Sequence, residues 1–292
     1  MTGSMVALVT PFRANGEVDE ETLRGLVQWH VGEGTDVLVP CGTTGESATL
    51  THEEHVEVIR CVVEEAAGRV PILAGTGSNS TREAIELTKK AKAVGASAAL
   101  VITPYYNKPP QRCLVSHFEA VVREGGLPIV VYNVPSRTGC NLLPETMAQL
   151  AENPGVIGLK DASGDLTQTA DTVELCGDRI TVLSGEDFLT LPMLSVGGKG
   201  AISVVANLAP KRCKKLMTSF FSGKIEEAKQ IHYELLPLAR ACFLPGEVNP
   251  IGVKMALSEM GHLEPVFRLP LEPLGEERKE MLRSLLQKGG VL

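Results

Sequence analysis

A lysine and a tyrosine lie at the ends of two successive apolar runs, and their side chains can do carbonyl chemistry. Lys160 closes the apolar run 156–160, and Tyr132 lies near the end of the preceding run, 128–133. A lysine that closes a buried strand is costly to keep charged, because burial disfavours an ammonium group. A neutral amine is a nucleophile, so imine formation with a carbonyl substrate is the first hypothesis. A phenol beside the amine can carry protons while the imine forms.

Each of these residues also has an ordinary structural interpretation. Lys160 could bury only its stem and extend its ammonium group to solvent, and Tyr132 could be a buried aromatic with a satisfied hydroxyl. Lys254 tests the pattern, because it too follows an apolar run, 250–253. Asn249-Pro250 is typical of a helix start, however, and apolar residues continue after the lysine. We therefore expect Lys254 on a helix.

Two loops carry groups that suit a carboxylate. The segment Gly42-Thr43-Thr44-Gly45-Glu46 is a tight turn with free amides and two hydroxyls, which can hold a carboxylate or a developing negative charge. Taken alone, however, glycine and threonine in such a loop are more often ordinary turn residues than binding groups. Arg137 follows Pro135 in a loop, where its planar fork suits bidentate carboxylate binding or is simply solvated. Cys41, just before the turn, either packs or makes the site sensitive to thiol reagents.

Phosphate and metal signals are weak. The glycine-rich segment 197–200 precedes an apolar run, which places it on the structural face of a barrel as a turn. The segment 207–210 follows the last apolar run, where barrels commonly bind a phosphate group. It has no glycine, so an unphosphorylated substrate is favoured. His52 and His55 lack the spacing of a helical zinc motif. We therefore expect no metal site.

Short apolar runs alternate with helical patterns, which predicts a (β/α)8 TIM barrel, with an open doubly wound sheet as the alternative. After about residue 224 the strand signals stop and helical patterns continue. We expect a catalytic barrel over 1–223 and a C-terminal helical extension over 224–292. Asp19 is predicted as an N-cap, and two capping boxes are predicted, Thr51 with Glu54 and Ser80 with Glu83. The eight predicted strands are 5–10, 37–40, 70–74, 98–103, 128–133, 156–160, 180–184 and 201–205.

Charge and composition exclude several classes of protein. The net charge is −7, and no cluster of Lys and Arg could follow a nucleic-acid backbone. No apolar run approaches the roughly 18 residues of a membrane span. The seven cysteines are scattered without a C-x-x-C pair, which predicts reduced thiols and a cytoplasmic protein.

At this point the sequence resembles the dihydrodipicolinate synthase family, which belongs to the class I aldolases related to N-acetylneuraminate lyase. The resemblance covers essentially the whole chain. It is carried by Gly-Ser-Met-Val-Ala at 3–7, Gly-Thr-Thr-Gly-Glu-Ser-Ala-Thr-Leu at 42–50, Thr-Pro-Tyr-Tyr-Asn at 103–107, Tyr-Asn-Val-Pro-Ser-Arg-Thr-Gly at 132–139 and the lysine run.

The resemblance implies that Lys160 forms an imine with pyruvate and that the derived enamine attacks L-aspartate 4-semialdehyde, a lyase-class condensation in the diaminopimelate route to lysine. Tyr132, Thr43 and Tyr106 match a proton relay, with Tyr106 contributed across a subunit interface. Thr44, Arg137, Gly185 and Ile202 match substrate-binding positions; in these, Thr44 and the Thr43 backbone receive the pyruvate carboxylate and Arg137 the second carboxylate.

The resemblance also implies regulation and assembly. Feedback-inhibited members bind lysine through residues that match Ser47, Ala48, His52, His55, Asn79, Glu83 and Tyr105, so inhibition by lysine is expected. Family members are usually homotetramers built as a pair of tight dimers, and they need no metal or organic cofactor. Related lyases that cleave sialic acid or 2-keto-3-deoxy sugar acids share the lysine and the tyrosine, and they are the alternative function. A catalytically silent regulator that binds pyruvate or an amino acid is a third reading, which the complete residue set disfavours.

Overall fold

The computed structural model describes residues 1–292, and the chain forms two compact units. Unit 1 comprises Met1–Gly3 and Ile72–Ile202, and unit 2 comprises Ser4–Pro71 and Ser203–Leu292. Unit 2 therefore joins the first strands of the chain to its last helices. The predicted division into a barrel over 1–223 and a helical region over 224–292 stays a prediction.

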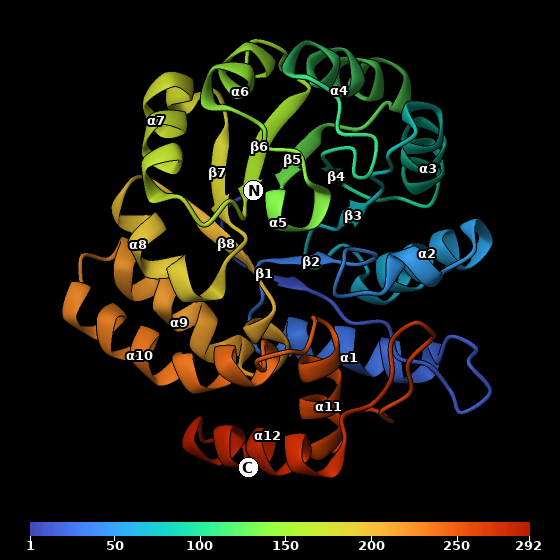
Figure 1. The fold of residues 1–292 in the computed structure, drawn as a ribbon, viewed down its shortest axis with the longest axis vertical. Coiled ribbons are helices and arrows are strands. Elements are labelled where there is room, and N and C mark those ends of the chain that lie inside the picture. Colours follow the sequence, from blue (N-terminus) through green and yellow to red (C-terminus); the bar gives the residue numbers. More distant parts are fainter. The chain divides into compact units, whose positions relative to one another are not determined.

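Eight strands alternate with helices along the chain, as the sequence predicts (Figure 1). Neighbouring strands pair in parallel. Within unit 1 the strand order is β8-β7-β6-β5-β4-β3, and in unit 2 β1 pairs with β2. The (β/α)8 class is confirmed. The strands are β1 (Gly3–Ala7), β2 (Val37–Val39), β3 (Leu73–Gly75), β4 (Ala98–Ile102), β5 (Ile129–Asn133), β6 (Val156–Asp161), β7 (Thr181–Ser184) and β8 (Gly200–Ser203).

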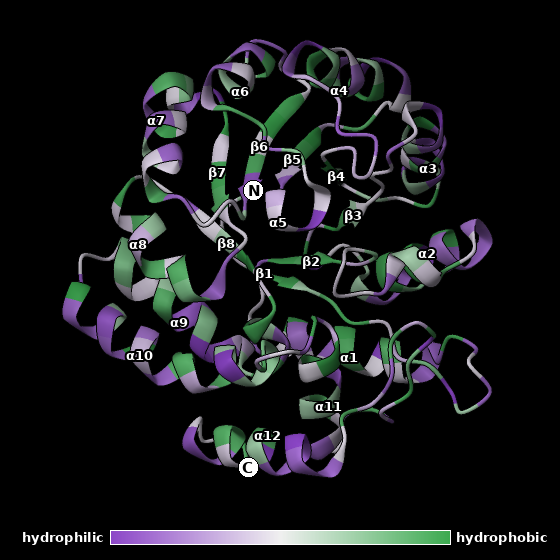
Figure 2. Ribbon diagram, in the orientation of Figure 1, coloured by the Kyte–Doolittle hydropathy of each residue, from purple (hydrophilic) through white to green (hydrophobic).

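The strands form where the sequence is continuously apolar. All five residues of β5 are buried, and only Ile157 of β6 is not. Burial on both faces is typical of parallel strands covered by helices. Figure 2 shows the same contrast, with green strands and helices striped in purple and green.

The helices of unit 1 cover the outer side of its strands (Figure 1). Successive helices are neighbours, with α3 beside α4, α4 beside α6 and α6 beside α7. The helices are α3 (Thr81–Ala93), α4 (Gln111–Gly125), α5 (Pro135–Thr138), α6 (Pro144–Leu150), α7 (Leu166–Cys176) and α8 (Thr190–Ser195), with short 3-10 turns at Gly177–Arg179 and Asp187–Leu189.

Unit 2 contains the remaining helices, and helices without further strands follow residue 224, as predicted. Helix α10 packs against α9, α11 and α12. No helix combines the length and apolar character that a membrane span requires. The helices are α1 (Glu20–Gly32), α2 (His52–Ala66), α9 (Pro210–Phe221), α10 (Ile225–Cys242), α11 (Ile251–Glu259) and α12 (Glu276–Lys288), with 3-10 turns at Ser47–Thr49 and Val205–Asn207.

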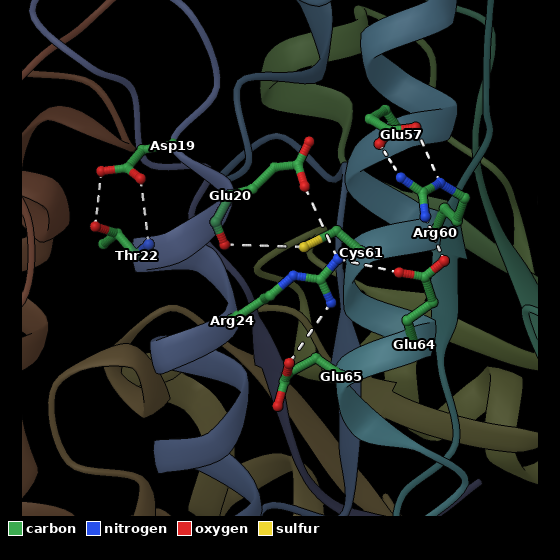
Figure 3. Close-up of polar contacts among 9 residues, drawn as sticks. All are labelled: Asp19, Glu20, Thr22, Arg24, Glu57, Arg60, Cys61, Glu64 and Glu65. Carbon is green, nitrogen blue, oxygen red and sulfur yellow. Dashed lines mark hydrogen bonds and ion pairs between the residues drawn. The ribbon is translucent and has the colours of Figure 1, made fainter.

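A charged network joins α1 to α2 on the surface of unit 2 (Figure 3). Arg24 of α1 lies 3.0 Å from Glu64 and 3.5 Å from Glu65 of α2. Arg60 pairs with Glu57 and Glu64 on its own helix. The Cys61 thiol lies beneath these ion pairs and contacts the Glu20 carbonyl at 4.0 Å. Such exposed pairs orient the helices but contribute little stability individually.

The predicted helix starts are confirmed in two cases and half confirmed in the third. Asp19 accepts a hydrogen bond from the Thr22 amide, and Thr51 and Glu54 form a complete capping box. Ser80 accepts from the Glu83 amide, but its own amide donates to Ser78 Oγ. The Glu83 carboxylate accepts from that same Ser78 hydroxyl.

Strand bounds differ most at β1 and β3: β1 was predicted over 5–10 and lies at Gly3–Ala7, and β3 was predicted over 70–74 and lies at Leu73–Gly75. Pro71 has no amide hydrogen for a ladder. The Ile72 amide donates to the Ser97 hydroxyl at 3.1 Å and not to a neighbouring strand. Regular strand pairing therefore begins at Leu73 and not at residue 70.

Candidate active site

Lys160 and Tyr132 lie side by side at the carboxyl ends of β6 and β5. The two residues are register partners across the parallel pair, and both are buried, with exposed fractions of 6% and 7%. The Lys160 amine lies 4.1 Å from the centroid of the Tyr132 ring. Adjacent parallel strands project equivalent residues on one face, which explains how sequence positions 28 apart meet. The side chains predicted to do the chemistry are thus adjacent.

Gly185 leaves the space that the Lys160 side chain occupies. A Cβ at residue 185 would lie 3.0 Å from Lys160 Cε and 3.1 Å from its Cγ. The Gly185 amide donates to the Asp161 carbonyl at 2.7 Å, which fixes this backbone against β6. Ile202 of β8 is buried, as a residue lining a site would be.

Polar side chains behind the pair anchor the ends of β5 and β6. The Asp161 carboxylate accepts from Thr169 Oγ1 at 2.7 Å and from the Ser163 amide at 2.9 Å. On the next strand, Asn133 Oδ1 accepts from the Leu142 amide at 3.0 Å. Because buried polar groups of this kind fix backbone position, they hold Lys160 and Tyr132 from the opposite face of the strands.

Arg137 is exposed on α5, a single turn that begins at Pro135 and ends at Gly139. A second charged group, Glu186, was missed by sequence reasoning. Burial and the neighbouring Asp187 carboxylate raise the pKa of Glu186, while the positive charges of Lys160 and Arg137 oppose this rise. Glu186 therefore lies within electrostatic reach of both cations. The available signal was a carboxylate directly after Gly185.

Tyr105 and Tyr106 follow β4 and project outward. Their exposed fractions are 39% and 89%, and Tyr106 has a left-handed backbone with φ 70°. The side-chain Nδ2 of Asn107 donates to the Asn79 carbonyl at 2.9 Å, which joins this loop to the loop before α3. An aromatic this exposed does not serve the core of its own chain.

In unit 2 the segment Gly42–Glu46 forms the predicted tight turn. The Gly45 amide donates to the Gly42 carbonyl and the Glu46 amide to the Thr43 carbonyl, both at 3.1 Å. Thr44 is buried, and its hydroxyl accepts from Asn249 Nδ2 at 3.0 Å. The Thr10 hydroxyl donates to the Gly45 carbonyl at 2.7 Å. The bonds from Asn249 and Thr10 come from two different parts of the unit, so the turn is held from outside as well as by its own backbone hydrogen bonds.

The candidate lysine-site residues of unit 2 follow directly after this turn. Ser47 and Ala48 lie in the 3-10 turn, His52 is exposed at the start of α2, and His55 is buried. The Cys41 thiol donates to the His55 carbonyl at 3.5 Å. Complete burial raises the pKa of the Cys41 thiol, so this cysteine packs and does not present a reactive thiolate.

Residues 1–289 match the sequence model of the dihydrodipicolinate synthetase family. The chain belongs to this family. A 4-hydroxy-tetrahydrodipicolinate synthase from Nitratidesulfovibrio vulgaris (strain DSM 19637 / Miyazaki F) is 54% identical over 291 residues, which cover 99% of each chain.

Solved dihydrodipicolinate synthase structures agree with this assignment. The enzyme from Aquifex aeolicus is 46% identical with a TM-score of 0.97, covering 100% of this chain and 99% of that one. The chloride-inhibited enzyme from Acinetobacter baumannii, complexed with pyruvate, is 44% identical with a TM-score of 0.97 and the same coverage. The enzyme from Cyanidioschyzon merolae with lysine bound is 40% identical with a TM-score of 0.95, again with the same coverage.

The predicted site residues of this dihydrodipicolinate synthetase family member divide between the two units. In unit 1, Tyr132 and Lys160 are register partners, and Gly185 borders the Lys160 side chain. Arg137 and Lys160 both interact electrostatically with Glu186. The two site residues in unit 2 are Thr43 and Thr44. The candidate lysine-site residues divide likewise, with Ser47, Ala48, His52 and His55 in unit 2 and Asn79, Glu83 and Tyr105 in unit 1.

Proposed function

We propose that this chain is a 4-hydroxy-tetrahydrodipicolinate synthase that condenses pyruvate with L-aspartate 4-semialdehyde in the diaminopimelate route to lysine. The observation that carries the proposal is the buried Lys160 amine 4.1 Å from the Tyr132 ring, in a chain of this family. A buried amine beside a phenol has the two groups that imine chemistry needs, a nucleophile and a proton carrier.

In the proposed reaction the Lys160 amine adds to the carbonyl carbon of pyruvate, and loss of water leaves an imine. The imine nitrogen is protonated, which draws electrons from the pyruvate methyl group and allows that group to lose a proton. The enamine that results attacks the aldehyde carbon of the second substrate. Tyr132 carries protons in the addition and dehydration steps.

The remaining catalytic and binding residues are assigned by the family resemblance. Thr43 and Tyr106 complete the proton relay with Tyr132, and Thr44 receives the pyruvate carboxylate together with the Thr43 amide. Gly185 and Ile202 border pyruvate. The exposed guanidinium of Arg137 suits the carboxylate of the aldehyde substrate, because its fork can bind both oxygens.

We propose that lysine inhibits this enzyme through Ser47, Ala48, His52, His55, Asn79, Glu83 and Tyr105. The lysine-bound relative from Cyanidioschyzon merolae supports a lysine site in the family. An assay with several millimolar lysine that leaves activity unchanged would contradict this part of the proposal.

We also propose a homotetramer built as two dimers, with Tyr106 reaching the site of a partner subunit. Its 89% exposure supports this role, since an aromatic side chain is seldom left in water without a partner surface. The seven free thiols fit a reducing compartment such as the cytoplasm. Analytical ultracentrifugation tests the oligomer, and cell fractionation tests the location.

Trapping with borohydride tests the central step. Pyruvate is added, the imine is reduced, and the added mass is located by peptide mapping. The adduct is expected at Lys160 and is expected to disappear in Lys160→Met. A matched control is Lys215→Met, which removes an exposed lysine of α9 and should leave the adduct at Lys160. An adduct elsewhere, or none in the wild-type protein, contradicts the proposed mechanism.

Substrate choice is tested separately. Arg137→Ala is expected to form the trapped pyruvate adduct and to condense poorly with L-aspartate 4-semialdehyde. Equal loss of both steps would count against the role of Arg137. Cleavage of N-acetylneuraminate or of a 2-keto-3-deoxy sugar acid, without condensation, would favour the alternative aldolase function.

A further inference from the structure

Lys254 and Glu46 form an ion pair that is fully enclosed within unit 2. Both side chains have an exposed fraction of 0%, and the Lys254 amine lies 2.5 Å from Glu46 Oε1. The amine also donates to the Val266 carbonyl at 2.6 Å. It faces the rings of Phe12 and Phe267, at 4.4 and 4.8 Å from their centroids. The ammonium is thus completely surrounded by a carboxylate, a carbonyl and two aromatic faces.

An enclosed ion pair of this kind is a poor source of stability. Removing two charges from water costs nearly as much as their attraction returns, and apolar side chains of similar volume often replace such pairs without loss. Burial lowers the pKa of Lys254, and the Glu46 carboxylate opposes this shift. What the pair does supply is a fixed direction and distance between two parts of the chain.

The part of the chain that the pair fixes is the turn with the two candidate threonines. Glu46 is the last residue of that turn, and it has a left-handed backbone with φ 52°. Cys41, just before the turn, has φ 56°. Residues other than glycine avoid this backbone conformation, because it costs each of them about 1–2 kcal/mol. A turn bounded by two such residues needs outside anchors to keep its shape.

Besides the Thr10 hydroxyl, the anchors come from one stretch near the C-terminus. Lys254 holds the Glu46 carboxylate, the amide of Arg268 donates to the same carboxylate at 3.4 Å, and Asn249 donates to the Thr44 hydroxyl at 3.0 Å. The Arg268 side chain further binds the Gly16 carbonyl and the Glu54 carboxylate. Helix α11 and the residues on either side of it therefore hold the turn through the side chains of Thr44 and Glu46.

We propose that Lys254 is a positioning residue for pyruvate binding: through Glu46 it holds the turn so that Thr43 and Thr44 present their donors to the pyruvate carboxylate. The inference rests on the proposed function, in which these threonines bind that carboxylate. It predicts that loss of the pair weakens pyruvate binding while Lys160 keeps its chemistry.

The double variant Glu46→Gln with Lys254→Met tests this, because it removes both charges and leaves no buried ion unpaired. It is expected to keep a melting temperature close to wild type, to raise the KM for pyruvate about tenfold, and to change kcat at saturating pyruvate by less than about threefold. A stable double variant with the wild-type KM overturns the inference, because the pair is then only structural.

The matched control is the double variant Glu259→Gln with Arg283→Met. This ion pair, at 2.8 Å, also involves α11 but points to α12, and it does not touch the turn. Its removal is expected to leave the pyruvate KM unchanged. An equal rise of KM in the control assigns the effect to general loosening of α11 and overturns the role of Lys254.

A second variant decides the matter if the first does not fold. Glu46→Asp keeps both charges but shortens the carboxylate arm, so it is expected to raise the pyruvate KM with kcat preserved; an unchanged KM overturns the inference. Borohydride trapping at saturating pyruvate separates the two levels of the argument. No adduct in the wild-type protein refutes the proposed function itself, whereas normal trapping with an unchanged KM in the variants refutes only the positioning role.

Discussion

His30 on α1 makes the stability of this protein depend on pH in a defined direction. Its ring is completely enclosed, Nδ1 lies 3.2 Å from the Thr35 hydroxyl, and Nε2 is buried without a hydrogen-bond partner. Burial, with a smaller effect of the His262 charge, lowers the pKa of His30 to about 3 from an ordinary value of 6.5. The folded protein therefore holds this ring neutral across the neutral and mildly acidic range.

The direction of this pH dependence follows from which state of the chain binds a proton at His30. Below pH 6.5 the unfolded chain takes up a proton at this histidine and the folded chain does not, so acid favours unfolding. The contribution is fully present above about pH 6.5 and is lost as the pH falls toward 3. Between pH 6.5 and pH 5, an interval of about 1.5 pH units, protonation stabilises the unfolded state by about 1.4 kcal/mol per pH unit. Lowering the pH from 7 to 5 therefore lowers the free energy of unfolding by about 2 kcal/mol.

Urea unfolding at pH 5, 6 and 7, at one protein concentration, measures this quantity for the wild type and for His30→Phe. The variant is expected to be less stable at pH 7, because the Thr35 hydroxyl loses its partner, yet to lose about 2 kcal/mol less than wild type on going to pH 5. Leu26→Val, on the same helix, is the control: it lowers stability at every pH and leaves the wild-type slope. Parallel pH profiles for wild type and His30→Phe would refute the argument.

Three further predictions concern the site and the surface. Gly185→Ala is expected to fold but to lose most pyruvate trapping, because the new methyl group would lie about 3 Å from two carbons of Lys160; undiminished trapping would contradict this. Cys41 is expected to resist iodoacetamide in the native protein at pH 7 and to react only after unfolding, as read by mass spectrometry. Arg24→Met is expected to lower the free energy of unfolding by less than about 1 kcal/mol, and by less still in 1 M salt, because its pairs with Glu64 and its neighbours are exposed. A loss of several kcal/mol would show that this network is more than a surface feature.

The elements that sequence predicts well are those whose pattern is local. The strands ending in Tyr132 and Lys160 were located because a parallel strand covered on both faces is apolar at every position. Caps such as Thr51 with Glu54 were found because the two residues lie three apart. The β3 bounds were wrong because they depend on where the Ile72 amide finds its partner, and that partner lies in another loop.

The parts that could not be predicted depend on contacts between distant residues. Lys254 was correctly placed on a helix, but its amine was not predicted to meet Glu46, which lies 208 positions earlier. The influence of Glu186 on the site arises from burial and from three neighbouring charges, none of which a linear pattern encodes. The resemblance to a family supplied roles for residues, whereas the structure supplied the partners that hold them.

The separation of Glu46 and Lys254 along the chain has a consequence for biosynthesis. A ribosome makes the Gly42–Glu46 turn early, but the amine that neutralises its carboxylate comes 208 residues later. Unit 1 is nearly continuous in sequence, so its strands can pair while the chain is still growing; unit 2 must wait for its second half. A nascent or truncated chain that ends before Lys254 contains Lys160 and Tyr132 but lacks the amine that pairs with the Glu46 carboxylate. The Gly42–Glu46 turn is therefore completed only when the last part of unit 2 has been made.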